Sequence, residues 1–317
     1  WNIFEMTIDA IMLKEIKAAA IQIQEGELVG FPTETVYGLG ADATSDDAVT
    51  KIFSTKGRPK FNPLIIHVTS IEEARQYGVF SKVALDIAHH FWPGPLTLIL
   101  PRTTECSISW LATAGLSTIA LRVPDHPIAN ELIKRADRPI AAPSANRSGK
   151  ISPTRAEDVI EEFRHKVETV LDGGNCQVGL ESTVIDISGS NTVLLRPGYI
   201  TQYDIENKVG PINKTVNNAK IVAPGMLKSH YAPDCKVRLN ASSSKNGELF
   251  LGFGENSKNT TLNLSVTGNL NEAASNLFQM LRELDKRGAL AIAVAPIPEH
   301  GLGIAINDRL KRAAAPR

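Results

Sequence analysis

Hydrophobic positions switch along the chain between helical spacing and short continuous runs, which predicts a protein that mixes helices and strands. Apolar residues recur at helical spacing over residues 8–24, and the run ELVGF that follows is typical of a buried strand. Ser45 before two acids predicts the start of a second helix, which Gly57 and Pro59 end. Similar patterns predict helices over 81–91, 127–134 and 157–163, strands at PLIIHV, LTLIL, TIALRV, PIAAP and VETVLDGG, and a hairpin-like pair at STVIDIS and TVLLRPG.

This first part lacks the strict alternation of a doubly wound fold, and the texture of the chain changes after about Gly198. Residues 201–225 are polar and contain Pro211 and Pro224, which predicts a linker. Strands at KVRLN, LFLGFG and ALAIAVAPI follow, with helices over 270–286 and at the end of the chain. We therefore expect a second, small α/β domain.

Composition adds few constraints. Lys+Arg and Asp+Glu both number 34 among 317 residues, so no overall field attracts nucleic acid or an anionic membrane. The three cysteines are far apart, which argues against a disulfide framework or a Cys-based zinc site and fits a reducing cytoplasm. The longest apolar runs are too short to cross a bilayer. The stretch WNIFE before Met6 lacks the basic and apolar regions of a secretory signal.

The segment KIFSTKGRPK carries a candidate phosphate site. Lys56 and Arg58 lie two residues apart at a predicted helix end, so both could face one side and bind a polyphosphate. A lone KxR pair is more often a solvated basic turn. Asn62 and His67 follow directly, however, and add groups with directional hydrogen bonds.

Polar residues also crowd the ends of other predicted strands. Ser144 and Ser152 follow the run PIAAP in a loop that could bind a ligand or simply cap the next helix. Arg122 and Arg196 end two further strands, where an arginine is usually a surface ion-pair partner. If these arginines converge with Lys56 and Arg58, the cleft would select anions.

The stretch FPTETVYGLG places hydroxyls and a carboxylate between a strand and what we take to be a glycine turn. The hydroxyls could be turn-makers and caps, and GLGADA fits a dinucleotide fingerprint poorly, because no acid follows about 20 residues later. The sequence contains no P-loop, HExxH motif or G-x-S-x-G elbow. An enzyme built on this chain would therefore bind phosphate by another route.

Taken together, these segments resemble the YrdC family, in particular its long two-domain members, the threonylcarbamoyl-AMP synthases. The matching stretches are FPTETVYGLG, KGRPKFNPLIIHV, WPGPLTLIL, STIALRVPDHP, APSANRSGKISPT, GLESTVID and LLRPG, in order over roughly residues 10–200. The stretch APGMLKSHYAP (223–233) and the ending GLGIAINDRLKRAA look like the linker and second domain of the long form.

The resemblance implies a YrdC-like twisted mixed sheet with helices over 8–200, a linker over 201–233 that reaches the active site, and a small Rossmann-like α/β domain over 234–317. It also implies a nucleotidyltransferase. L-threonine and bicarbonate form a carbamate, which attacks the α-phosphorus of ATP to give threonylcarbamoyl-AMP and pyrophosphate. Downstream enzymes, the threonylcarbamoyl-transferase complex, pass the group to the tRNA adenosine beside the anticodon. A weak contact with tRNA itself is compatible with this role.

The resemblance further implies the residues of the site. Lys56 and Arg58 would be catalytic through the phosphates. The ATP site would comprise Lys56, Arg58, Asn62, Thr118, Ser144, Ser152, Arg196 and Tyr231. The threonine site would comprise Thr33, Tyr37, His67, Arg122, Ala142 and Ser182. Mg²⁺ would be carried with ATP, because acids are scarce in these motifs and no protein ligands for a metal are expected.

Two alternatives compete with this interpretation. A basic face could make the chain an RNA-binding module without catalysis, although its zero net charge and lack of basic stripes with interleaved aromatics weigh against this. The fold also forms one domain of a hydrogenase-maturation factor that transfers carbamoyl groups. That factor would need a zinc finger with CxxC pairs, and this sequence has none.

Overall fold

The computed structural model describes residues 8–214, 229–255 and 257–316. The stretch before Ile8 and residues 223–228 of the predicted linker motif lie outside this range. No helix within it is long and apolar enough to cross a membrane.

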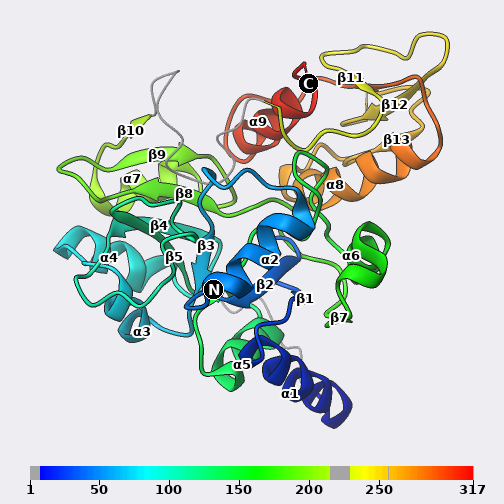
Figure 1. Ribbon diagram of the computed structural model, residues 1–317. Helices are drawn as coiled ribbons and strands as arrows, with labels where there is room; N and C mark the ends of the chain where they lie inside the picture. Colours follow the sequence, from blue (N-terminus) through cyan, green and yellow to red (C-terminus); the bar gives the residue numbers. More distant parts are fainter. Residues whose placement is uncertain (1–7, 215–228, 256, 317) are drawn as a thin grey trace.

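One mixed, twisted sheet organises the first half of the chain (Figure 1). Its strand order is β10-β9-β8-β4-β5-β3-β6-β2-β1-β7. The strands are β1 (Val29–Phe31), β2 (Gly38–Asp42), β3 (Ile65–His67), β4 (Leu96–Pro101), β5 (Thr118–Arg122), β6 (Ile140–Ala141), β7 (Thr169–Val170), β8 (Thr183–Asp186), β9 (Val193–Arg196) and β10 (Asn213–Lys214). The predicted hairpin-like pair is confirmed, because β8 and β9 pair antiparallel.

Helices cover the two faces of this sheet unequally. They are α1 (Ala10–Gln24), α2 (Asp46–Lys56), α3 (Ile71–Tyr77), α4 (Lys82–Phe91), α5 (Pro127–Ala136), α6 (Ala156–Phe163) and α7 (Gln202–Val209). Helices α2, α4 and α7 bury their apolar stripes in one large core with Ile66 and Leu121. Because successive strand residues point to opposite faces, Ile65 and Ala120 belong to a second, smaller cluster on the other side. Helices α1 and α5 form a separate core with Phe31 and Ile140.

The prediction of a glycine turn after FPTETVY is wrong, because Gly38–Asp42 is the strand β2, paired with β1 and β6. The glycines allow a close approach instead. A Cβ on Gly40 would lie 2.7 Å from Cε1 of Phe31 and 2.9 Å from Cγ2 of Ile140. Glycine is therefore needed here because the neighbouring side chains leave no room for a Cβ.

The first residues of the predicted linker form regular structure that packs on the first half of the molecule. Thr201 and Asp204 form a capping box at the start of α7, and Ile205 is buried in the large core. β10 then pairs in parallel with β9 and extends the first sheet. Residues 201–214 thus belong to the first half of the molecule, and their polar composition reflects a helix with a single buried residue.

A smaller sheet organises the second half. Its order is β11-β14-β12-β13, and every pairing in it is parallel. Its elements are β11 (Lys236–Arg238), β12 (Glu248–Gly252), β13 (Leu262–Asn263), α8 (Leu270–Lys286), β14 (Ala291–Val294) and α9 (Gly303–Ala313). Figure 1 shows α8 and α9 between this sheet and the first half. Their core also takes in Val36, Ile151 and Leu180 from the first half, so apolar contacts join the two.

Candidate active site

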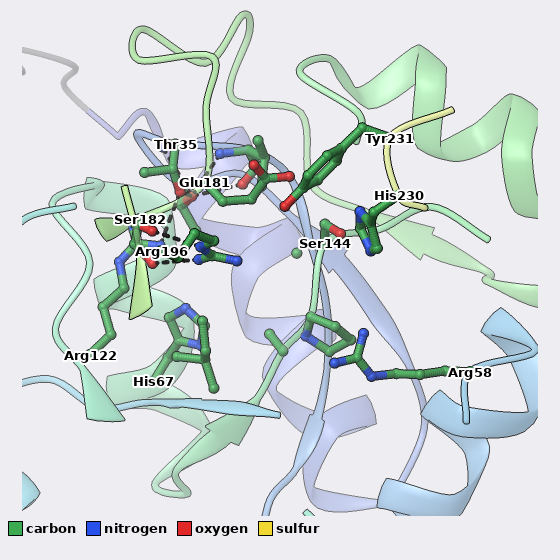
Figure 2. Close-up of a pocket in the computed structure, with 16 residues that line it drawn as sticks. Thr35, Arg58, His67, Arg122, Ser144, Glu181, Ser182, Arg196, His230 and Tyr231 are labelled. Carbon is green, nitrogen blue, oxygen red and sulfur yellow. Dashed lines mark hydrogen bonds between the residues drawn. The ribbon is translucent and has the colours of Figure 1, made fainter. Parts of the chain in front are cut away.

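A cavity of about 50 Å³, partly open to solvent, lies where segments from both halves of the predicted architecture meet (Figure 2). The lining residues are Thr33, Thr35, Val36, Gly38, Arg58, Ile65, His67, Arg122, Ala142, Pro143, Ser144, Glu181, Ser182, Arg196, His230 and Tyr231.

Arg58 enters the cavity from the end of α2. Gly57 ends that helix in the left-handed conformation, at φ 61°, and the amide of Arg58 then donates to the carbonyl of Phe53. The Arg58 guanidinium donates to the carbonyls of Asn62 and Pro63, at 3.2 and 2.8 Å. Burial lowers its pKa to about 10, so Arg58 stays positively charged at neutral pH.

Arg122 and His67 lie opposite each other at the ends of β5 and β3. Arg122 is held by a buried ion pair, 2.6 Å from its Nη2 to Oε1 of Glu34, and its Nη1 donates to Oγ1 of Thr35 at 3.0 Å. Burial, together with the charge of Arg122, lowers the pKa of His67 to about 3. The imidazole therefore faces the cavity as a neutral hydrogen-bonding group.

Arg196, at the end of β9, is fixed against the segment that precedes β8. Its Nε donates to the carbonyl of Ser182 and its Nη2 to Oγ of the same residue, both at 3.0 Å. Oγ of Thr97 lies 2.7 Å from that hydroxyl. Ser182 and Arg196 therefore form one unit on the cavity wall.

The loop after β6 brings Ser144 to the cavity, and Lys56 supports this loop from behind. The Lys56 ammonium donates to the carbonyl of Ser144 at 2.5 Å and to that of Asn146. Burial and then the charge of Arg58 lower the pKa of Lys56 well below its usual value. Lys56 does not line the cavity in this conformation, so its observed role is to shape the loop.

The FPTET segment is a self-bonded turn. Oγ1 of Thr33 donates to the carbonyl of Val36 at 2.7 Å and lies 2.7 Å from Oγ1 of Thr35. Tyr37 points away, because its hydroxyl donates to the carbonyl of Gly174 at 2.8 Å and accepts from the amide of Gly173 at 3.0 Å. Tyr37 thus fixes a neighbouring loop, and it does not line the cavity.

His230 and Tyr231 close one side of the cavity. Tyr231 adopts a positive φ of 61°, an uncommon conformation for a bulky residue. Its ring stacks on Phe278 of α8 at 5.4 Å between centroids. The amide of Ala232 donates to the carbonyl of Gly149, which ties this segment to the loop after β6. The buried hydroxyl of Tyr231 has no hydrogen-bond partner among the described residues and is free to bind a ligand.

The structure thus brings together most of the residues expected from the resemblance. Those on the cavity wall are Thr33, Arg58, His67, Arg122, Ala142, Ser144, Ser182, Arg196 and Tyr231. Those that do not line it are Tyr37, Lys56, Asn62, Thr118 and Ser152. Asn62 is buried, and neither its side-chain oxygen nor its nitrogen has a hydrogen-bond partner among the described residues. Thr118 begins β5, at the opposite end from Arg122, about 13 Å along the strand.

Three polar side chains at or behind the cavity wall are not among the site residues that the resemblance implies. Glu181 lines the cavity and accepts a hydrogen bond from Ser152. His230 lies beside Tyr231, and Glu34 holds Arg122. The stretches GLESTV, SHYAP and FPTET contain these residues, but their partners are distant in sequence. Within the described residues no group of three or more His, Cys, Asp or Glu side chains could hold a metal ion.

Comparison with known proteins shows which family the chain belongs to. The family model described as Telomere recombination, for the Sua5, YciO and YrdC proteins, matches residues 22–198. A second, described as Threonylcarbamoyl-AMP synthase, C-terminal domain, matches residues 200–315. The threonylcarbamoyl-AMP synthase of Pyrococcus abyssi is 42% identical over 96% of this chain and 95% of its own length. That of Bacillus subtilis is 40% identical over 96% and 94%.

Solved structures show the same family relationship. The crystal structure of P. abyssi Sua5 complexed with L-threonine has a TM-score of 0.88 and 41% identity, covering 95% of this chain and 94% of that one. A phosphate- and nucleotide-bound HypF has 21% identity, a TM-score of 0.52 and only 28% of its length covered, which shows a shared fold alone. The chain therefore belongs to the Sua5–YciO–YrdC family and carries the C-terminal domain of its threonylcarbamoyl-AMP synthases.

Proposed function

We propose that this chain is an L-threonylcarbamoyladenylate synthase. The amine of L-threonine combines with bicarbonate, with loss of water, to give a carbamate. A carbamate oxygen then attacks the α-phosphorus of ATP, the bond to the β-phosphate oxygen breaks, and pyrophosphate leaves. The products are threonylcarbamoyl-AMP and pyrophosphate. An identity of 40–42% to named synthases, over 96% of this chain and 94–95% of theirs, supports this assignment.

One observation carries the proposal most directly: Arg58, Arg122 and Arg196 come from separate segments and converge on one cavity. Two carboxylates beside them, Glu34 and Glu181, are both paired with arginines. A site of this kind neutralises and positions anions without supplying a nucleophile of its own. In-line transfer between a carbamate and ATP requires this chemistry, because both reactants are anionic.

The nucleotide side would lie between α2 and the segment around Tyr231. Arg58 and Arg196 would neutralise the phosphates, while Ser144 and Tyr231 would donate hydrogen bonds. Lys56, Asn62 and Ser152 would act from behind this wall, and a conformational change that opens the segment 229–233 would expose them. The assignment of Thr118 to the nucleotide stays a prediction, because it lies far from the cavity along β5.

The threonine side would lie against β3 and β5. Arg122 retains donors that Glu34 and Thr35 do not use, and these suit the substrate carboxylate. Thr33, His67, Ala142 and Ser182 would surround the rest of the amino acid. Tyr37 would contribute by fixing the adjoining loop. The threonine complex of the P. abyssi relative supports threonine as the substrate here.

Mg²⁺ would enter with ATP as the counter-ion of its phosphates. The donor set fits this role, because the carboxylate of Glu181 on the cavity wall is occupied by Arg309 and Ser152. We place the reaction in the cytoplasm, in keeping with three free cysteines. The product would pass to the threonylcarbamoyl-transferase complex that modifies tRNA, with at most a weak direct contact between this chain and tRNA.

The test is pyrophosphate release from ATP by the purified chain with Mg²⁺. We expect release that requires both L-threonine and bicarbonate, and Arg58→Ala to reduce kcat/KM for ATP by about a hundredfold because it removes a charged contact to the phosphates. Arg75→Ala is the matched control, since Arg75 is exposed in the last turn of α3. Release that is equal without threonine would refute the proposal.

A further inference from the structure

Arg309, on α9, is completely buried at the back of the cavity wall, 0% exposed. Its Nε donates to Oε2 of Glu181 at 2.9 Å, and its Nη2 lies 3.3 Å from the carbonyl of the same residue. Its Nη1 donates to the carbonyl of Pro197 at 2.8 Å and to Oδ2 of Asp308 at 2.9 Å. Burying a guanidinium is costly unless its donors are satisfied, so this set of contacts needs a reason beyond packing. The neighbouring Lys311 is 63% exposed and pairs with Glu299.

Arg309 controls the charge of Glu181. Burial raises the pKa of this carboxyl, but Arg309 and Arg196 outweigh that effect and hold it below its usual value. Glu181 is therefore ionised on the wall of a cavity that we assign to anionic substrates (Figure 2). Arg309 neutralises this charge and orients the carboxylate, whose other oxygen accepts the hydrogen bond of Ser152.

Arg309 also joins the two segments that carry Ser182 and Arg196. Gly198 packs so tightly on the first segment that a Cβ there would lie 2.4 Å from the amide nitrogen of Thr183. The hydrogen bonds of Arg309 to Glu181 and Pro197 fasten the same two segments from the other side. Its guanidinium carbon lies 5.4 Å from the ring centroid of Tyr231.

We propose that Arg309 is a positioning residue of the synthase site, through which the C-terminal helix holds Glu181, Ser152 and Tyr231 in the arrangement that binds the nucleotide. This inference rests on the proposed function. It gives the second half an indirect part in ATP binding, because without Arg309 the carboxylate of Glu181 would face the phosphates without its arginine partner.

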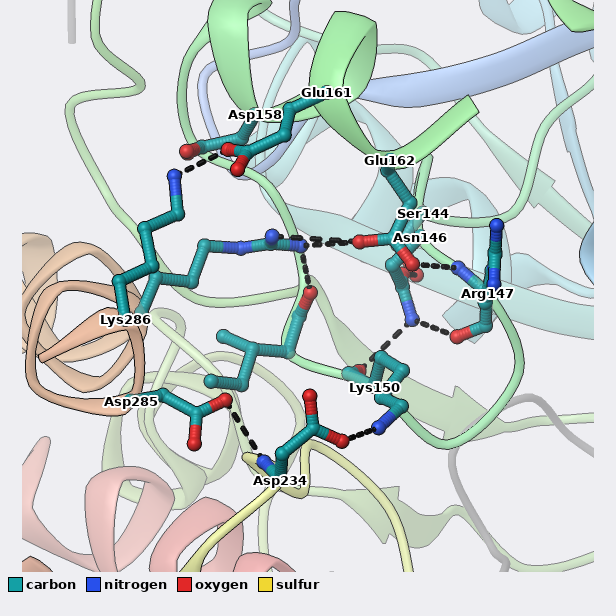
Figure 3. Close-up of polar contacts among 12 residues, drawn as sticks. Ser144, Asn146, Arg147, Lys150, Asp158, Glu161, Glu162, Asp234, Asp285 and Lys286 are labelled. Atoms are coloured by element: carbon teal, nitrogen blue, oxygen red, sulfur yellow. Dashed lines mark hydrogen bonds and ion pairs between the residues drawn. The ribbon is translucent and has the colours of Figure 1, made fainter. Parts of the chain in front are cut away.

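The alternative is that Arg309 only attaches the second half to the first. Other side chains perform that task away from the cavity (Figure 3). On α8, Arg282 pairs with Glu162 at 3.4 Å and donates to the carbonyl of Ile151, and Lys286 pairs with Glu161. None of these residues lines the cavity. Arg282→Met therefore weakens the junction without exposing Glu181, and serves as the matched control.

The experiment measures dissociation constants for a non-hydrolysable ATP analogue by calorimetry, steady-state KM and kcat, and melting temperatures, all in the full-length chain. Arg309→Met should weaken analogue binding and raise KM for ATP about tenfold or more, with a smaller change in KM for threonine. Glu181→Gln combined with Arg309→Met should recover most of this loss, because the buried carboxylate that Arg309 pairs with is then also removed. Arg309→Lys should have an analogue affinity and a KM for ATP between those of wild type and Arg309→Met.

Arg282→Met should lower the melting temperature and leave analogue binding within about twofold of wild type. Equal analogue affinity in Arg309→Met and wild type, or a double variant no better than Arg309→Met, would overturn the inference. If Arg309→Met does not fold, the affinities of Arg309→Lys and the double variant for the ATP analogue are compared with that of wild type instead. Wild-type affinity in Arg309→Lys, or a double variant that binds no better than Arg309→Lys, would then overturn the inference. Failure of the proposed function would show separately, as wild-type protein that binds the analogue but releases no threonine-dependent pyrophosphate.

Discussion

Each arginine of the cavity is held by hydrogen bonds or an ion pair that the sequence did not predict. Arg122 is held by Glu34, and Arg196 by Ser182. Strand-end positions were enough to single out Arg122 and Arg196 as candidates. Their convergence could not be predicted, because it depends on the order of strands in the sheet. Arg309 lies in the ending GLGIAINDRLKRAA that matches the second domain of the long form, but nothing in the sequence distinguishes it from Lys311 and Arg312, the basic residues in the last turn of α9.

The buried imidazole of His67 predicts loss of stability in acid. Burial and Arg122 hold its pKa at about 3, whereas in the unfolded chain it protonates near its ordinary value. Between these values the unfolded state binds the additional proton, so stability falls as pH falls. From about pH 7 to about pH 5 this one group should cost about 2 kcal/mol of unfolding free energy.

Chemical denaturation at both pH values checks this prediction. His67→Gln should reduce the acid-induced loss by about that amount, whereas the same substitution at the exposed His165 should leave the loss unchanged. An acid-induced loss as large in His67→Gln as in wild type would show that this histidine is not the cause.

Helices with regularly spaced apolar residues were predictable from the sequence. Very short strands that are defined by pairing with another strand were not. The helices α1, α2, α4 and α8 follow from their spacing and caps. The two-residue strands β10 and β13 were not predicted and are defined by their pairing with β9 and β12, whereas β6 and β7 lie within the runs PIAAP and VETVLDGG that were predicted as strands. β2 was predicted as a turn because its glycines suggest one, although tight packing on Phe31 is their physical reason.

Gly40→Ala tests that reason. The added Cβ would lie 2.7 Å from Cε1 of Phe31, so we expect the free energy of unfolding to fall by about 1–3 kcal/mol. Gly189→Ala is the control, because a Cβ there meets nothing within 4 Å, and it should change stability by less than about 0.5 kcal/mol. Thermal or denaturant unfolding measures both, and equal stability of the two variants would contradict the packing account.

At the scale of the whole molecule, the cavity depends on residues from both halves of the chain. The first sheet supplies the strand ends that carry Arg122 and Arg196, while α8 and α9 hold Tyr231 and Glu181 in place. The sequence predicted two α/β regions, and family resemblance placed the linker near the site. The sequence could not show that the core of the second region packs against Ile151 and Leu180, because contacts between residues so distant in sequence depend on the folded structure.

The central claim is that one cavity joins threonine, bicarbonate and ATP. The most direct measurement is mass spectrometry of the nucleotide product formed by the full-length chain with isotope-labelled bicarbonate. The account predicts threonylcarbamoyl-AMP that carries the label, formed in step with pyrophosphate and greatly reduced in Arg58→Ala. An unlabelled product such as threonyl-AMP, or no threonine-containing nucleotide at all, would contradict it.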